Sequence, residues 1–287
     1  MRIGIGLPAT IPGTPGDLVL TWAQRAEERG FSSLGVIESI AFPSYDAPSV
    51  LAAGAAATER IGLLANLLIG PARNPALLAK QAASIDRLSG GRFIMGVGVG
   101  SSEEDYDLAE QLFHDRGKRW DAALETIHRV WSGEPVNGAS GPVGPTPTNG
   151  LSVPLLFGGM SAEAIRRTVR WGVGWTAGAA GLPVVAPFAE RVCQAWREAG
   201  KEGDPRLVCM SYFALGHGAS EGIERYLRRY YEPGPYVEQV LRNTPSTPAA
   251  LRGVVAAYGD AGFDEMIFSP TIASLDQLNL LADALLA

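Results

Sequence analysis

The strongest constraint in this sequence is an alternation of apolar runs with amphipathic helical patterns. Residues 61–69 and 93–97 are two nearly continuous apolar runs, and the helical pattern between them begins near Asn74 and ends near Gly90. Strands that are covered on both faces lose the polar alternation, so two such runs joined by one helix predict a parallel strand-helix-strand unit. A glycine-rich run at residues 96–102 follows the second strand, at the end where parallel α/β folds place their functional sites.

The same order of strand and helix recurs along the whole chain. Apolar runs predict strands at residues 2–7, 34–37, 61–69, 93–97, 154–157, 174–177, 207–215 and 265–268. Eight repeats in one unbroken series predict an α/β fold, a (β/α)8 TIM barrel with short insertions, as a single domain over residues 1–287. A doubly wound open sheet is the alternative, but it rarely needs eight consecutive units of even length.

Two stretches interrupt the series. Residues 133–153 are rich in Gly and Pro, which is also typical of a domain linker, but the alternation resumes at once and favours a surface excursion. Residues 216–246 predict a helical insertion rich in Tyr and Arg. Such a pair of helices could be a lid over a pocket or a solvated outer pair.

Composition excludes several classes of protein. The 24 basic and 30 acidic residues give a net charge of −6, and no cluster of Lys or Arg suits a phosphate backbone, so we expect no nucleic-acid partner. The two cysteines match neither a disulfide framework nor a metal site, and the three histidines are scattered, so we expect no metal. No apolar run approaches the roughly 18 residues of a membrane span, which predicts a cytoplasmic protein with no membrane partner.

The glycine run after the fourth strand allows three interpretations. A dinucleotide-binding fingerprint fails, because Glu103 stands where the third glycine of the spacing should be. Tight packing of a strand end is a second interpretation. The third is an anion site, in which backbone N–H groups and two hydroxyls receive a phosphate. The residues of this candidate site are Gly98, Val99, Gly100, Ser101 and Ser102.

A second segment has the same form. Gly158, Gly159, Met160 and Ser161 lie between the fifth predicted strand and the helix that follows it. Two such segments on neighbouring strand ends favour a phosphate site, since barrels commonly hold phosphate there.

Polar residues at buried strand ends are further candidates. Asn66 interrupts the apolar run 61–69, and a buried amide without partners costs about 1–3 kcal/mol, so we expect a polar group to meet it. Glu38 ends the second predicted strand, where a helix cap or a salt bridge is an equally good explanation.

Several motifs together resemble one family. They are Glu27-Glu28-Arg29-Gly30-Phe31, Ala57-Thr58-Glu59-Arg60-Ile61, the block from Arg73 to Gln81, the block from Leu88 to Gly100, Arg116-Gly117-Lys118-Arg119, Gly158-Gly159 with Ser161, and Gly262-Phe263-Asp264. The chain is identified by these motifs as similar to the luciferase-like monooxygenases over nearly its whole length.

The resemblance implies a barrel that holds FMN or the deazaflavin coenzyme F-420 at the carboxyl ends of its strands. It implies a non-proline cis peptide, which matches Asn66-Leu67 here, and a cofactor phosphate against residues 98–102 and 158–161. Asn66 and Glu38 would take the polar, catalytic positions at the ring. The substrate pocket would be lined by Phe42, Tyr45, Tyr226 and Tyr230.

Two departures from the family pattern bear on the cofactor. Relatives that use the deazaflavin often have His directly after the acidic residue of the second strand, and Ser39 stands here, which favours FMN. Relatives also tend to have Gly-Asp-Gly-Trp at the sixth strand. Val173 replaces that Asp, so the hydrogen bonding around the cofactor pocket is expected to differ.

The working hypothesis is a flavin-dependent oxidoreductase: a monooxygenase that oxidises a small organic substrate with oxygen and reduced FMN. No nicotinamide fingerprint is present, so a separate flavin reductase would be a partner. A coenzyme F-420-dependent reductase or dehydrogenase and a non-catalytic flavin-binding barrel are the alternatives. The resemblance also suggests a homodimer.

Overall fold

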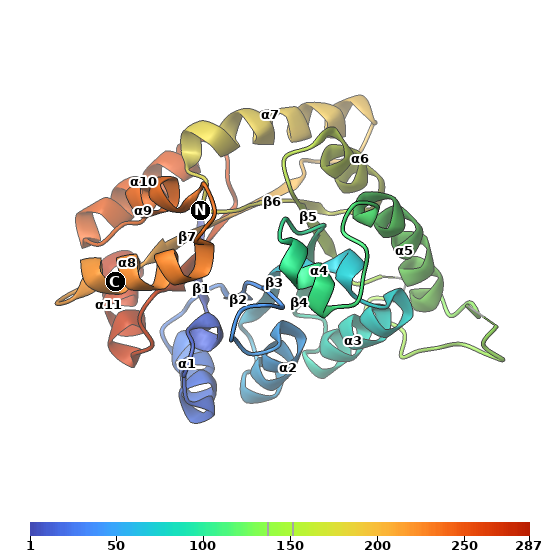
Figure 1. Cartoon of the computed structure of the whole chain (residues 1–287), viewed down its shortest axis with the longest axis horizontal. Coiled ribbons are helices and arrows are strands. Elements are labelled where there is room, and N and C mark those ends of the chain that lie inside the picture. Colours follow the sequence, from blue (N-terminus) through green and yellow to red (C-terminus); the bar gives the residue numbers. More distant parts are fainter. Residues whose placement is uncertain (137, 151) are drawn as a thin grey trace.

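The computed structural model describes residues 1–136, 138–150 and 152–287, and it confirms the TIM barrel. Eight parallel strands pair in sequence order, and β8 pairs back with β1 to close the barrel. The helices form an outer ring around the strands (Figure 1). The strands are β1 (Arg2–Gly6), β2 (Ser33–Val36), β3 (Gly62–Ile69), β4 (Phe93–Gly98), β5 (Leu155–Gly158), β6 (Gly174–Ala177), β7 (Arg206–Phe213) and β8 (Glu265–Pro270).

The helices follow the strands in the predicted order. They are η1 (Pro8–Thr10), α1 (Gly16–Glu28), α2 (Ala47–Ala57), η2 (Gly70–Ala72), α3 (Pro75–Leu88), α4 (Glu103–Leu108), α5 (Arg116–Trp131), α6 (Ala162–Trp171), α7 (Leu182–Glu198), α8 (Ala219–Tyr231), α9 (Val237–Asn243), α10 (Pro248–Asp260) and α11 (Leu275–Leu285). Within the described ranges, no helix has the length and apolar character that crossing a membrane requires.

Two apolar clusters explain why the strands lack polar alternation. One lies between the strands and the helices, and the other fills the barrel with side chains such as Leu64, Leu156, Val208 and Ile267. Each strand therefore buries both of its faces.

The amino-terminal end of the barrel is tied together by Glu265 at the start of β8. Its carboxylate accepts hydrogen bonds from the hydroxyls of Ser32 at 2.5 Å and Ser33 at 2.7 Å, and it forms ion pairs with Arg206 and, at 3.4 Å, with Arg2. Burial alone would raise the pKa of Glu265, but the two hydroxyls and two guanidinium groups hold it below its usual value. This cluster joins β1, β2, β7 and β8.

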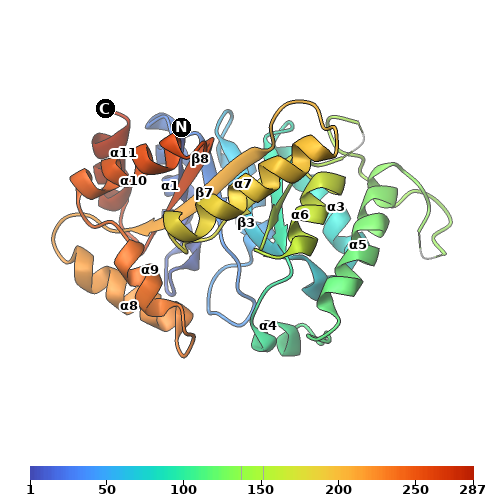
Figure 2. The same ribbon diagram turned by 90° about the horizontal axis from the view of Figure 1, so that it is seen from above.

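The insertion predicted at residues 216–246 is helical and consists of α8 and α9. Figure 2 shows α4, α8 and α9 on one side of the molecule, opposite both chain termini. Since Arg2 begins β1, the termini mark the amino ends of the strands, so these helices lie at the carboxyl ends. The predicted excursion at residues 133–153 follows α5, and residues 137 and 151 within it lie outside the described residues.

Candidate functional site

Asn66 lies in β3, inside the carboxyl-terminal half of the barrel. The Asn66-Leu67 peptide bond is cis, as the family resemblance implies. Asn66 Oδ1 accepts a hydrogen bond of 2.6 Å from Thr176 Oγ1 on β6, across the barrel. Asn66 Nδ2 is buried and has no hydrogen-bond partner among the described residues. The Asn66 amide therefore keeps one donor free for an acceptor from outside the chain, at the carboxyl-terminal half of the barrel.

The side chain of Leu67 explains why two of the predicted site residues are glycines. A Cβ added to Gly98 would lie 2.8 Å from Leu67 Cδ1, and a Cβ added to Gly158 would lie 2.0 Å from Leu67 Cδ2. The side chain of Leu67 therefore occupies the space that glycine leaves at the ends of β4 and β5. Tight packing, one of the interpretations of the glycine run, accounts for Gly98, and a role in phosphate binding stays a prediction.

Both carboxylate oxygens of Glu38 have partners within the protein. Its side chain is 4% exposed, Oε2 accepts a hydrogen bond of 2.8 Å from the N–H of Ile69, and Oε1 forms an ion pair with Arg73. Arg73 also pairs at 3.1 Å with Asp46, whose carboxylate caps α2. Burial opposes the charge of Arg73, but Glu38 and Asp46 hold the pKa of Arg73 above its usual value. Glu38 therefore ties the end of β2 to the end of β3 and the start of α3.

The first predicted phosphate segment has an acidic neighbour and a basic one. Gly100 has φ +66°, a conformation that favours glycine, and Ser102 precedes α4, whose first turn is Glu103, Glu104 and Asp105. Arg116 supplies a positive charge beside these acidic residues, and its Nε donates a hydrogen bond of 3.3 Å to the carbonyl of Gly100.

Arg116 was not a predicted site residue. Among the described residues it forms no ion pair, and its guanidinium lies 3.6 Å from the centre of the Phe113 ring. The only sequence signal was the motif Arg116-Gly117-Lys118-Arg119, which was used for the resemblance alone.

The second predicted phosphate segment lies beside the first, because β4 pairs with β5. Gly159 has φ +100°, and its carbonyl accepts a hydrogen bond of 2.9 Å from Trp175 Nε1. Ser161 caps α6 by accepting a hydrogen bond of 3.2 Å from the N–H of Ala164, and Met160 is exposed. The structure therefore brings residues 98–102 and 158–161 together at one edge of the barrel mouth.

Three of the predicted pocket residues form one aromatic cluster, and the fourth shares a cavity with one of them. Phe42, Tyr226 and Tyr230 pack on one another, with ring centres 4.9 Å apart for Phe42 and Tyr230 and 5.9 Å apart for the stacked tyrosines. Burial raises the pKa of both tyrosines, so their hydroxyls stay protonated. Tyr45 donates a hydrogen bond of 2.7 Å to the carbonyl of Thr14, and it lines a cavity of about 330 Å³ together with Phe42 and Glu38.

Two hydrogen bonds hold α8 over the barrel mouth. The Tyr226 hydroxyl donates to Thr10 Oγ1 at 3.1 Å, and the Tyr230 hydroxyl donates to the carbonyl of Glu38 at 3.4 Å. Tyr212 on β7, which was not a predicted site residue, adds a contact of 3.0 Å between its hydroxyl and that of Tyr231. The insertion therefore covers the end of the barrel between β1, β2 and β7.

Val173 lies far from these residues along the barrel. It precedes β6, donates its N–H to the carbonyl of Leu155 at the start of β5, and is 41% exposed. Position 173 therefore lies at the amino end of β6, and an effect of the missing Asp on the cofactor pocket stays a prediction.

The residues at the mouth fit a flavin-type ring and its phosphate. The unpartnered Asn66 Nδ2 needs an acceptor, and the edge of such a ring carries carbonyl oxygens. A Cβ added to Gly178, just beyond β6, would meet nothing within 4 Å, so space is open above that strand end. Arg116 supplies positive charge beside residues 98–102.

The sequence profile of the luciferase-like monooxygenases matches residues 1–277. An uncharacterized protein of Mycobacterium tuberculosis is 32% identical over 209 residues, which cover 62% of this chain and 71% of that protein. Two solved structures share the fold. An F-420-dependent secondary alcohol dehydrogenase in complex with an F-420–acetone adduct is 16% identical, with a TM-score of 0.82 and coverage of 99% of this chain and 98% of that one.

The second structure is the oxygenating constituent of 3,6-diketocamphane monooxygenase from Pseudomonas putida, in complex with FMN. It is 15% identical, with a TM-score of 0.74, and covers 99% of this chain and 95% of that one. These two likenesses establish the fold, and the profile match establishes the family. The chain therefore belongs to the luciferase-like monooxygenases, a family of oxidoreductases that use a flavin or a deazaflavin.

Proposed function

We propose that the protein is a monooxygenase that oxidises a small organic substrate with oxygen and with reduced FMN from a separate flavin reductase. The observation that carries the proposal is the buried, unpartnered Asn66 Nδ2 at the barrel mouth, which calls for an acceptor such as a ring carbonyl of the cofactor. The fold neighbour that is an oxygenating constituent in complex with FMN supports the choice of FMN as the cofactor.

The chain's own residues would bind and orient the cofactor. Asn66 would donate to the ring, with its side chain oriented by Thr176. Residues 98–102 and 158–161 would hold the phosphate, with Arg116 as the counter-charge. Bound reduced FMN would supply the electrons with which oxygen is activated.

Other residues would position and protect the site. Glu38 would act by holding the end of β3, through the N–H of Ile69 and through Arg73, rather than by exchanging a proton. Phe42 and the tyrosines of α8 would exclude water from the ring, which strengthens polar interactions inside the pocket. A homodimer stays a prediction.

The charge around α4 favours FMN over coenzyme F-420. Glu103, Glu104 and Asp107 are exposed immediately beyond residues 98–102. The deazaflavin coenzyme continues past its phosphate into an acidic glutamyl tail, and like charges at such a distance repel. FMN ends at the phosphate, where Arg116 lies.

Titration of the purified protein with FMN and with coenzyme F-420, followed by the change in cofactor fluorescence, tests the proposal. We expect FMN to bind more tightly than F-420. We expect Asn66→Ala to weaken FMN binding about tenfold, because one buried hydrogen bond is worth about 0.5–1.5 kcal/mol. Asn279→Ala is the matched control, since Asn279 lies on α11 and accepts a hydrogen bond from Arg29.

The outcomes separate the alternatives. Tighter binding of F-420 would favour hydride transfer by a dehydrogenase or reductase. FMN binding without any effect of the protein on the rate at which oxygen consumes reduced FMN would favour a non-catalytic flavin-binding barrel. Failure of FMN to bind would overturn the proposal.

A further inference from the structure

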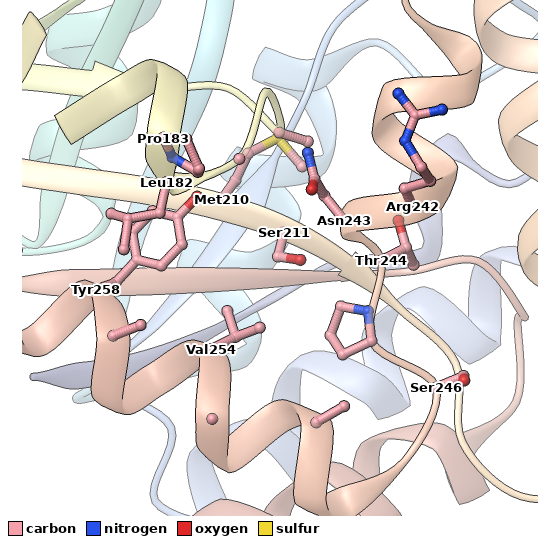
Figure 3. Close-up of a pocket in the computed structure, with 16 residues that line it drawn as sticks. Leu182, Pro183, Met210, Ser211, Arg242, Asn243, Thr244, Ser246, Val254 and Tyr258 are labelled. Atoms are coloured by element: carbon pink, nitrogen blue, oxygen red, sulfur yellow. The ribbon is translucent and has the colours of Figure 1, made fainter. Parts of the chain in front are cut away.

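A cavity of about 480 Å³ lies outside the barrel mouth, between α7, β7 and the segment from α9 to α10 (Figure 3). The cavity exists because β6 ends earlier than its neighbour β7. The last residue of β6, Ala177, pairs with Cys209, whereas β7 continues to Phe213 with β8 as its remaining neighbour. The barrel wall is therefore open beside Met210 and Ser211.

The walls of this cavity are mainly apolar. Leu182 and Pro183 at the start of α7 form one side, and Val254 and Ala257 on α10 form the other. Met210 forms the inner end, and its side chain belongs to the cluster that fills the barrel. The cavity thus reaches from the helix layer to the barrel interior.

The rim of the cavity is fixed by hydrogen bonds. Gln239 Nε2 and Asn243 Nδ2 on α9 both donate to the carbonyl of Ala180, at 2.6 Å and 3.1 Å. The only charged residue in the lining is Arg242, which is exposed at this rim.

Tyr258 on α10 presents an unpartnered hydroxyl to the cavity. The residue is 6% exposed, and its hydroxyl, which forms no hydrogen bond with any described residue, is open to solvent through the cavity. Figure 3 shows the hydroxyl pointing toward Leu182 and Met210. Of the three other lining hydroxyls, Ser211 donates to the carbonyl of Tyr212 and Thr244 to that of Val240, while Ser246, half-buried between α9 and α10, has no partner among the described residues. Burial raises the pKa of Tyr258, so the hydroxyl remains a donor at neutral pH.

Gly253 lies on the solvent-exposed edge of the cavity, as do Ala250 and Ala257 on the same helix. A Cβ added at this position would meet nothing within 4 Å, although glycine within a helix is destabilising relative to alanine. No contact among the described residues requires glycine here. Because Gly253 lines the cavity, a large side chain at this position would take up part of its open space.

We propose that this cavity binds a neutral, mainly apolar small molecule through a single hydrogen-bond acceptor of the ketone or ester class, which receives the Tyr258 hydroxyl. The volume lies within the range of about 300–1,000 Å³ that is usual for small-molecule sites, and such sites combine apolar walls with a few placed polar groups. The site is separate from the residues assigned to the cofactor and does not depend on the proposed monooxygenase activity.

The test uses 6-propionyl-2-(dimethylamino)naphthalene, an uncharged naphthalene whose only strong acceptor is a ketone and whose emission reports polarity and hydrogen bonding. We expect it to bind the full chain with a blue-shifted emission. Tyr258→Phe should weaken binding at least fivefold and shift the bound emission further to the blue, because the ketone loses its donor. Gly253→Leu should weaken binding at least tenfold by filling the cavity, with a melting temperature equal to or above that of the wild type.

Tyr236→Phe is the matched control, since Tyr236 is 64% exposed, and it should bind the probe as the wild type does. FMN titration of the same variants should give the wild-type affinity, which separates this site from the cofactor site. The proposal is overturned if the wild type does not bind the probe, if Gly253→Leu binds it unchanged, or if Tyr258→Phe alters neither affinity nor emission.

Discussion

The replacement Glu38→Gln tests whether the carboxylate at the end of β2 is a structural anchor. The side chain is 4% exposed and serves the N–H of Ile69 and the guanidinium of Arg73. Glutamine has the same shape but no charge, and it can no longer offer an acceptor oxygen to both donors. One buried donor must therefore lose its partner, while Arg73 keeps only Asp46.

The expected loss of stability follows from these contacts. Breaking a buried ion pair by removing one partner costs about 3–5 kcal/mol. The cost should be lower here, because Arg73 is 18% exposed and retains Asp46 at 3.1 Å. We therefore expect the free energy of unfolding to fall by about 2–3 kcal/mol, on the order of a 100-fold change in the folding equilibrium.

Urea unfolding followed by tryptophan fluorescence measures this change. Glu134→Gln is the control, because Glu134 forms an exposed ion pair with Arg129 at 3.1 Å and should lose less than about 1 kcal/mol. If Glu38→Gln unfolds within about 0.5 kcal/mol of the wild type, the carboxylate does not anchor β3. A direct part in proton transfer would then be the better explanation of Glu38.

Three further predictions concern the barrel. The folded-state pKa of Glu265 lies below its unfolded value, so its contribution to stability is present above about pH 4.5 and is lost as the pH falls through the folded pKa. Glu265→Gln should flatten the dependence of the melting temperature on pH between pH 3 and 7. An unchanged pH profile would contradict this role of Glu265. Gly158→Ala should lower the free energy of unfolding by about 1–3 kcal/mol, because the added Cβ would clash with Leu67. In a double-mutant cycle measured by urea unfolding, Leu67→Ala should relieve this loss. Strictly additive effects would show that the two side chains do not meet. Gly70→Ala should cost about 3 kcal/mol, because its Cβ would lie 2.4 Å from the buried ring of Trp120, and an unaltered melting temperature would refute this.

The strands and helices were predictable because their signals are local. The apolar runs 61–69 and 93–97 became β3 (Gly62–Ile69) and β4 (Phe93–Gly98), with differences of a residue at the ends. The start of α3 was equally visible, since Asn74 caps the helix by accepting from the N–H of Leu77. Eight such units in series leave few topologies other than a closed barrel.

The contacts within the candidate site were much less predictable. Glu38 and Arg73 are 35 residues apart in sequence, and either could have met another charge or water. The glycines at 98 and 158 suggested a phosphate site, while the side chain that requires them, Leu67, lies on a third strand. Tyr258 carried no signal at all, because its lack of a partner is a property of its surroundings.

The sequence by itself determined the order of strands and helices, the closure that eight units favour, and the edge of the barrel at which polar and glycine residues gather. These features depend on period and on neighbours along the chain, which a sequence records directly. Only the tertiary structure decided that Asn66 keeps one unpartnered donor, that Leu67 fills the space over two glycines, and that the early end of β6 opens a cavity beside β7. Such features depend on distances between residues far apart in the chain, and these distances are set when the barrel closes and its side chains pack.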